Sequence, residues 1–203
     1  MLMGRLTSVE ELKALADAAR NDLFAQAKEM GRDPKIYLHW TAGKYETDFP
    51  EYHICITGAG KLVLMANLTE TLAHTWKRNS GSIGITLNCA YGANAIDLGE
   101  YAPTAAQIEA MAQAIAAIAD GLWLTIDKAH VMTHGEAADN EDGLEIYEQY
   151  GPRTTCERWD LEYLGTEESP SFNPWAIDGS RGGDVLRGKA NWYRHKWQED
   201  KNE

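Results

Sequence analysis

The sequence predicts a single α/β domain in which helices pack on a β-sheet. Short apolar, β-prone segments alternate along the chain with longer segments whose apolar residues recur at helical spacing. A length of 203 residues fits one domain, and a hydrophobic content of 44% is ordinary for a globular protein with a sizeable core. No internal repeat or low-complexity linker divides the chain, so we expect residues 1–203 to form one unit.

Helices are predicted from capping residues followed by apolar stripes. Thr7 or Ser8 can cap the first helix, because a side-chain oxygen accepts a hydrogen bond from an unpaired N–H of the first turn. Pro103 and Thr104 open a second, alanine-rich helix. The predicted helices and their apolar stripes are about 8–30 (Leu12, Leu15, Ala16, Ala19, Leu23, Ala27), about 103–122 (Ile108, Met111, Ile115, Ile118) and about 182–197 (Val185, Leu186, Trp192, Tyr193).

Strands are predicted where short apolar runs are bounded by turn residues. The glycines around Ala59 separate two such runs and predict a hairpin, because glycine supplies the positive φ of a tight turn. Two other runs end at His39 and His134. The predicted strands are 35–39, 52–57, 61–66, 82–89 and 129–133; residues 158–164 are expected to form a brief helix, 136–148 an acidic loop and 169–174 a further loop.

The composition excludes several classes of function. A formal net charge of -12 argues against a nucleic-acid binder, since phosphate contacts need a clustered basic face. The three cysteines lack a C-x-x-C pair, so neither a disulfide framework nor a cysteine zinc knuckle is indicated. Acidic and basic residues interrupt the first 24 residues, so we expect no signal peptide, and no segment is apolar enough to insert stably in a membrane.

The histidines do not reveal a metal site by their spacing. A catalytic zinc ion takes three protein ligands and leaves one position open for water. None of the six histidines forms the H-E-x-x-H pattern of common metalloproteases. The local sequences are more informative: His39 lies in LHWTAG, His134 in VMTHGE and Asp160 in CERWDLEYL, two positions after Arg158.

Together these segments resemble the type 2 N-acetylmuramoyl-L-alanine amidases, a family that includes the T7-lysozyme-like phage endolysins and the peptidoglycan recognition proteins. The resemblance covers about 37–164, and its parts follow the order of the family: HWTAG, the hairpin with Tyr52, HTWKRNSGSIGITL, the alanine-rich helix, THGE and RWD. It implies a central mixed sheet flanked by helices, with a zinc site at strand ends. It also implies that zinc-activated water cleaves the amide between N-acetylmuramic acid and the L-alanine of the stem peptide.

The resemblance also assigns roles to residues. It implies that His39, His134 and Asp160 bind Zn2+, that Arg158 stabilises the oxyanion in place of a family lysine, and that His74 lies near the scissile group. Some members use a glutamate after the I-G-I strand for proton transfer. Thr86 stands there in this chain, so Tyr52, which matches a tyrosine of the T7-like members, is the better candidate. Trp40, Tyr45, Trp76, Asn79 and Thr86 are predicted to contact substrate, although core packing is the commoner fate of such aromatic residues.

Alternatives stay open for the third ligand and for the biological role. Cys156 rivals Asp160, since both thiolate and carboxylate bind zinc; the Arg158-x-Asp160 pattern favours Asp160. His53, His130 and His195 are predicted to be structural or exposed. The leading hypothesis is a monomeric endolysin that is made in the host cytoplasm, released by a holin-type route and cuts bacterial peptidoglycan. A muropeptide-recycling amidase, an antibacterial effector or a non-catalytic peptidoglycan-binding protein are the alternatives.

Overall fold

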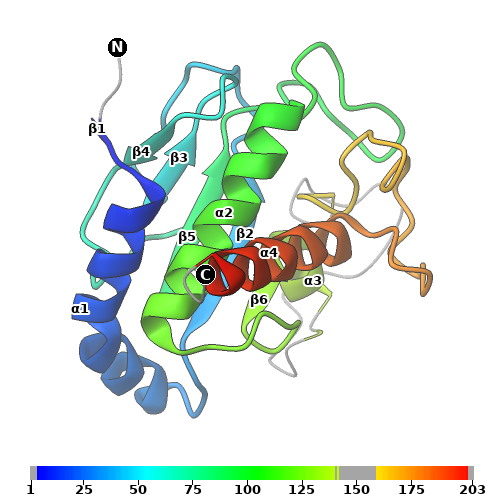
Figure 1. Ribbon diagram of the computed structural model, residues 1–203. Coiled ribbons are helices and arrows are strands. Elements are labelled where there is room, and N and C mark those ends of the chain that lie inside the picture. Colours follow the sequence, from blue (N-terminus) through cyan, green and yellow to red (C-terminus); the bar gives the residue numbers. More distant parts are fainter. Residues whose placement is uncertain (1–3, 140, 142–158, 201–203) are drawn as a thin grey trace.

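The fold is a six-stranded mixed sheet with helices packed against it (Figure 1). A computed structural model describes residues 4–139, 141 and 159–200. The strand order is β1-β4-β3-β5-β2-β6, in which β2 is parallel to β5 and β6, β3 is parallel to β5, and β4 is antiparallel to β1 and β3. The elements are β1 (Arg5–Leu6), α1 (Val9–Glu29), β2 (Lys35–Trp40), β3 (Ile54–Ile56), β4 (Leu62–Leu64), β5 (Ser82–Leu87), α2 (Ala105–Leu122), β6 (Val131–Thr133), α3 (His134–Ala138) and α4 (Gly182–Glu199).

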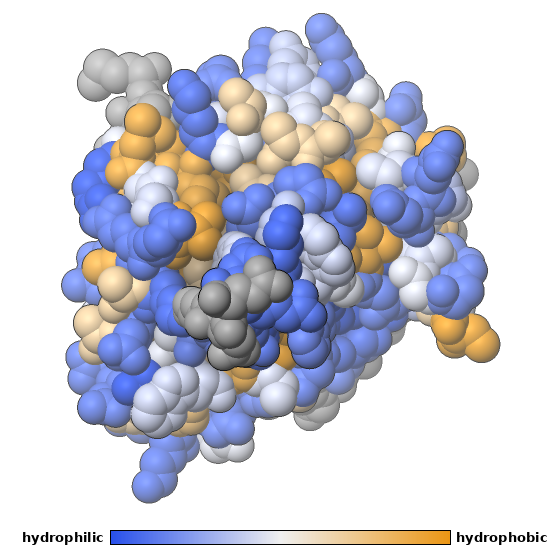
Figure 2. Space-filling view, viewed as in Figure 1, coloured by the Kyte–Doolittle hydropathy of each residue, from blue (hydrophilic) through white to orange (hydrophobic). Residues whose placement is uncertain are grey.

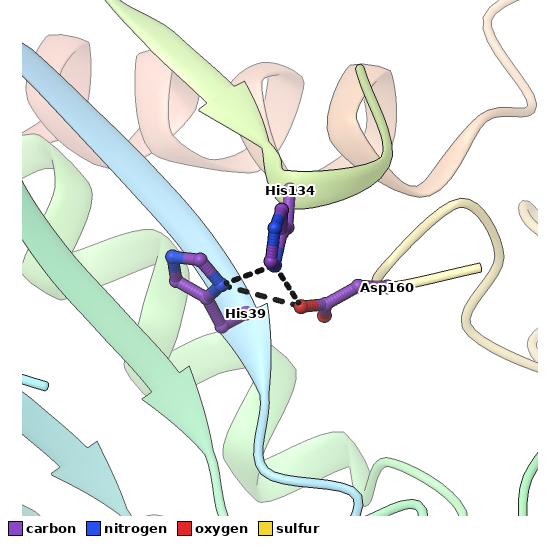
Figure 3. A group of neighbouring side chains, drawn as sticks. All are labelled: His39, His134 and Asp160. Carbon is purple, nitrogen blue, oxygen red and sulfur yellow. Dashed lines mark hydrogen bonds and ion pairs between the residues drawn. The ribbon is translucent and has the colours of Figure 1, made fainter. Parts of the chain in front are cut away.

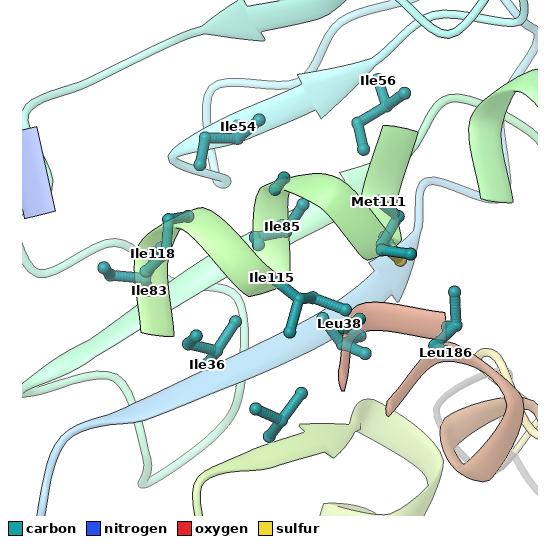
Figure 4. Close-up of a cluster of buried hydrophobic side chains, with 14 of the residues drawn as sticks. Ile36, Leu38, Ile54, Ile56, Ile83, Ile85, Met111, Ile115, Ile118 and Leu186 are labelled. Carbon is teal, nitrogen blue, oxygen red and sulfur yellow. The ribbon is translucent and has the colours of Figure 1, made fainter. Parts of the chain in front are cut away.

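One face of the sheet carries the main hydrophobic core. In β2, Ile36 and Leu38 face α2, and Figure 4 shows them below Ile115 and Ile118 of that helix. Helices α1 and α4 pack on either side of α2. Burying this much aliphatic surface is the principal source of stability for such a fold.

The opposite face of the sheet carries polar groups. Side chains alternate along a strand, so Tyr37 and His39 of β2 project away from α2. Tyr37 instead packs with Met132 of β6 and Ala137 of α3. The main core and the functional side chains therefore occupy opposite faces of the same strands.

The predicted α/β fold, with a mixed sheet flanked by helices, is confirmed. Ser8 caps α1 and Thr104 forms a capping box at α2. Two short elements were missed: β1, and α3, whose residues 136–138 fall in a segment predicted to be loop. The brief helix predicted for 158–164 is wrong over its described part, since residues 159–162 form turns, residues 163–164 are irregular, and the φ of Leu161 is 58°.

The surface is largely hydrophilic on the face shown in Figure 2, where apolar side chains form scattered patches. Such a surface fits the acidic composition. Among the described residues, no helix has both the length and the apolar character needed to cross a bilayer.

Candidate metal centre

His39 is positioned by the centre of the sheet. Strand β2 lies between β5 and β6, and its backbone register pairs His39 with Thr86 of β5. The side chain is fully buried and points away from α2. Pairing with β5 at His39, and with β6 up to the preceding residue, fixes the Cα and Cβ of this histidine firmly.

His134 enters from the junction between β6 and α3. Thr133 caps α3: its hydroxyl accepts a hydrogen bond from the Glu136 N–H at 3.1 Å, and the Glu136 carboxylate accepts one from the Thr133 N–H at 2.9 Å. This reciprocal capping box fixes the first turn of the helix. His134 is the first residue of that turn, so the cap sets the direction of its side chain.

Asp160 comes from the turn that follows the undescribed segment. One of its carboxylate oxygens, Oδ1, accepts a hydrogen bond from the backbone N–H of Trp40. Its backbone carbonyl accepts one from Gly135 N–H at 3.3 Å. The carboxylate is therefore attached to the end of β2, next to His39, and its second oxygen, Oδ2, is turned toward the two histidines.

The three side chains converge on one point (Figure 3). His39 Nδ1, His134 Nδ1 and Asp160 Oδ2 are each 3.2 Å from the other two atoms. Metal-to-ligand distances of about 2.0–2.1 Å in a tetrahedral site put neighbouring ligand atoms about 3.3 Å apart. Two imidazoles and one carboxylate at this spacing form a group that could hold a metal ion.

Burial keeps three histidines, His39, His53 and His74, in their neutral form. Desolvation lowers the pKa of His39 to about 4, even though Asp160 acts in the opposite direction. It lowers the pKa of His53 to about 4 and that of His74 well below its usual value. A neutral imidazole has a free lone pair, which is the form that binds metals.

A family model described as N-acetylmuramoyl-L-alanine amidase matches residues 18–158, more than half of the chain. The chain belongs to this amidase family. The predicted family and enzyme class are thus confirmed, and bacterial peptidoglycan is the substrate class. The match includes His39 and His134 and ends two residues before Asp160.

One solved structure similar to the amidase is the endolysin N-acetylmuramoyl-L-alanine amidase LysCS from Clostridium intestinale URNW. The two chains are 16% identical, and the TM-score is 0.40 over 52% of this chain and 71% of the other. No curated protein matches the amidase.

Two of the predicted site residues lie at the rim of the metal centre of the amidase. The ring of Tyr52 is 5.0 Å from that of His39, centroid to centroid. Trp76 is 50% exposed and follows Thr75, whose hydroxyl contacts His39. Both side chains are partly exposed to solvent.

Other predicted substrate contacts are turned inward. Trp40 follows His39 in β2 and so points to the opposite face, where it packs in the main core near Tyr163. Thr86 is fully buried beside His39. Tyr45 donates its hydroxyl hydrogen to the Ala102 carbonyl at 2.9 Å.

His74 and Asn79 also lie behind the metal centre. His74 is 5% exposed, and its ring is 5.4 Å from that of His39. The Thr75 hydroxyl connects it to Nε2 of His39, whereas Asp160 contacts Nδ1. Asn79 accepts a hydrogen bond from the Thr75 N–H at 2.7 Å. Two further predictions, the oxyanion role of Arg158 and the rival ligand Cys156, lie outside the described residues.

Buried ion pairs, which the sequence did not predict, hold two of the three candidate ligands. Arg187 of α4 donates to both carboxylate oxygens of Glu136 at 2.8 Å and to the Val131 carbonyl at 2.9 Å. Arg181, at the N-cap of α4, donates to both carboxylate oxygens of Glu162 at 3.0 and 2.9 Å. The order Thr-x-x-Glu at 133–136 is a capping-box pattern that could have predicted α3; no local pattern indicates its arginine partner.

Proposed function

We propose that the amidase is zinc-dependent and that His39, His134 and Asp160 are its metal ligands. The observation that carries the proposal is the equal 3.2 Å spacing of the three donor atoms. The donor types support zinc, which prefers imidazole nitrogen and carboxylate oxygen in catalytic sites with three protein ligands. The bond proposed to be cut is the amide between N-acetylmuramic acid and the L-alanine of the stem peptide.

The residues of the chain prepare the site for this reaction. When bound, zinc would polarise the amide carbonyl and lower the pKa of an attacking water molecule to about 7. Asp160 supplies one negative charge against two neutral imidazoles, so the site keeps a net positive charge with a divalent ion. Because Trp40 N–H holds Asp160 Oδ1, only Oδ2 is free to face the metal.

We propose roles for three residues that would act around the scissile amide. Tyr52 lies against His39 and is the proposed partner for proton transfer, with a hydroxyl that can donate to or accept from the reacting atoms. Trp76 is the proposed aromatic surface for a sugar ring or a peptide methyl group. Arg158 is the proposed cation for the oxyanion.

Digestion of purified sacculi tests the reaction. The wild-type protein, loaded with zinc, is expected to release free stem peptides and leave glycan strands at full length, and a chelator should abolish the release. His39→Ala and Asp160→Ala should each lower the rate at least about 1,000-fold and reduce the bound zinc. His130→Ala is the matched control, because that histidine lies on the surface with Asp127 and Thr125.

Two results would contradict this assignment. New reducing ends would mean that the glycan strand is cut instead of the amide. Loss of zinc from Cys156→Ala, together with full zinc content in Asp160→Ala, would make Cys156 the third ligand.

We further propose that the amidase acts in bacterial lysis as an endolysin. The support is that Tyr52 matches a tyrosine of the T7-like members, while Thr86 stands where some other members have a glutamate after the I-G-I strand. Expression in bacteria with a pore-forming holin should cause lysis, and Asp160→Ala should not. Cleavage of soluble muropeptides alone, with intact sacculi left uncut, would favour a recycling enzyme.

A further inference from the structure

The segment 74–79, directly behind His39, is held rigidly. The Thr75 N–H donates to Asn79 Oδ1 at 2.7 Å, and the Thr75 carbonyl accepts from the Arg78 N–H at 3.0 Å. The guanidinium of Arg32 donates to the carbonyls of Arg78 and Ser80 at 2.8 and 2.9 Å. These bonds fix the backbone of Thr75, which is 1% exposed.

The Thr75 hydroxyl lies between two histidines. Its oxygen is 3.3 Å from Nε2 of His39 and 2.9 Å from Nδ1 of His74. A hydroxyl donates one hydrogen and accepts at its lone pairs. Thr75 can therefore accept a hydrogen bond from one histidine and donate one to the other. Which histidine donates to Thr75 decides which nitrogen of His39 carries the proton.

Ser82 sets the direction in which this series of hydrogen bonds runs. Its hydroxyl hydrogen is directed at backbone carbonyls, those of Asn79 at 2.8 Å and Arg78 at 3.0 Å. The oxygen of Ser82 can then only accept from His74 Nε2, which is 3.5 Å away. His74 consequently carries its proton on Nε2 and accepts from Thr75 at Nδ1, which leaves Thr75 to accept from Nε2 of His39.

The opposite direction leaves a buried group unsatisfied. In that arrangement His74 Nε2 would be an acceptor facing Ser82, whose hydroxyl hydrogen is already directed at backbone carbonyls. The described part of the chain shows no other donor to His74 Nε2. An unsatisfied buried acceptor loses its hydration without gaining a partner and so destabilises the folded state. The ring of His74 packs closely on the backbone of Gly84, where an added Cβ would lie 2.7 Å from it.

We propose that Thr75 is a positioning residue for the amidase: its hydroxyl holds His39 in the tautomer protonated at Nε2 and so presents the Nδ1 lone pair to the metal. His74 and Ser82 fix the orientation of that hydroxyl and do not touch substrate. This inference rests on the proposed metal site and assigns His74 a role behind the site. Groups that orient a ligating histidine in this way are worth about 10-fold to 100-fold in metal affinity or activity.

Two substitutions separate the hydroxyl from the shape of the side chain. Thr75→Val keeps the shape and removes the hydroxyl; we expect it to weaken zinc binding about 10-fold to 100-fold, measured by competition with a chromophoric chelator. Thr75→Ser keeps the hydroxyl, and it should bind zinc within about threefold of wild type. If Thr75→Val does not fold, Thr75→Ala takes its place against the same serine control.

The tautomer of His39 gives a readout that a merely structural role would not change. Nitrogen NMR of the metal-free protein should show His39 protonated at Nε2 in the wild type and in Thr75→Ser. In Thr75→Val the proton should move to Nδ1, where Asp160 Oδ2 can accept it. A wild-type His39 protonated at Nδ1 would overturn the proposal.

The failure of this inference differs from that of the proposed function. If the wild type binds no zinc, the metal site itself is wrong, whatever Thr75 does. If the wild type binds zinc and cleaves sacculi, but Thr75→Val binds zinc equally well, only the role of Thr75 is overturned. Equal losses in Thr75→Val and Thr75→Ser would also overturn it, because Thr75→Ser keeps the hydroxyl and a disturbance of the local packing would then account for the effect.

Discussion

The two sides of the metal centre are held in different ways. His39 belongs to the sheet side, where parallel strands and hydrogen bonds between neutral groups position it. His134 and Asp160 belong to the α4 side, where short segments are tied to α4 by buried ion pairs, Arg187 with Glu136 and Arg181 with Glu162. Thr133 Oγ1 and Glu162 Oε1, 3.5 Å apart, connect the two α4-side segments.

This difference predicts different sensitivities. A neutral hydrogen bond contributes about 0.5–1.5 kcal/mol, so the sheet side loses little when one is removed. Removing one partner of a buried ion pair leaves an uncompensated charge and costs about 3–5 kcal/mol. The α4 side should therefore be the more fragile half of the site, although it lies at the edge of the fold.

Replacing Arg187 should have the largest effect on stability. Arg187→Met leaves the buried carboxylate of Glu136 without its bidentate partner, and we expect the free energy of unfolding to fall by about 3–5 kcal/mol in urea titrations at pH 7. Lys189→Met is the control on the same helix: its partner Glu109 is 42% exposed, so the loss should stay below about 1 kcal/mol. Equal losses in the two variants would remove the distinction between the two sides.

A double substitution sharpens this test. Arg187→Met with Glu136→Leu removes both charges, and it should recover part of the stability lost in Arg187→Met, because a buried pair replaced by apolar groups can be nearly neutral. If the double variant is as unstable as Arg187→Met, the loss comes from packing and not from the unpaired carboxylate.

A methyl group at the start of α4 should have the next largest effect. Gly182 donates its N–H to the Glu162 carbonyl at 2.9 Å, and a Cβ there would lie 2.0 Å from the Leu161 carbonyl oxygen. Gly182→Ala must push α4 away from the turn that carries Asp160, at a cost of about 1–3 kcal/mol. We expect weaker zinc binding as well, measured by chelator competition.

Gly188 provides the matched control for this substitution. It lies in the same helix, and a Cβ there would meet no atom within 4 Å. Gly188→Ala should stabilise the protein by about 0.5–1 kcal/mol and leave zinc binding unchanged, because alanine favours a helix more than glycine does. If Gly182→Ala behaves like Gly188→Ala, contact between α4 and the Asp160 turn does not matter for the site.

The sheet side was largely predictable from the sequence, because its determinants are local. A short apolar, β-prone run predicts β2, and the HWTAG segment places His39 near its end. The alternation of side chains along a strand argues against Trp40 as a substrate contact, since neighbouring residues of a strand face opposite ways. Strand alternation therefore predicts the position of Trp40 in the core, whereas the family motif by itself does not.

The α4 side was not predictable in the same way. Arg187 and Glu136 are 51 positions apart, and no periodicity connects an arginine of a C-terminal helix with a cap at α3. The turn at Leu161 contradicts the predicted helix, because its φ of 58° lies in the left-handed region, which leucine rarely adopts and which local propensity does not predict. Structure that depends on contacts between distant segments has to be observed.

The pH dependence of stability should also distinguish the two sides, and its effect should be the smallest of those predicted. His53, on the sheet side, accepts from the Gly84 N–H at 3.0 Å through Nδ1 and donates to the Glu70 carbonyl at 2.9 Å through Nε2, so protonation would break a bond. Burial lowers its pKa from 6.5 to about 4. The unfolded chain therefore takes up the proton first, and stability falls as the pH drops from about 6.5 toward 4.

The α4 side responds in a lower pH range. Burial would raise the pKa of Glu136, but the hydrogen bonds and charge of Arg187 outweigh burial and lower it. The contribution of this carboxylate is full above its usual pKa of 4.5 and is lost only at lower pH. Between pH 7 and 5.5, metal-free wild type should lose about 1 kcal/mol more stability than His53→Asn, measured by urea unfolding at each pH. Equal losses would mean that His53 takes up its proton as readily in the folded protein as in the unfolded chain, and the pH dependence in this range would then have to come from other groups.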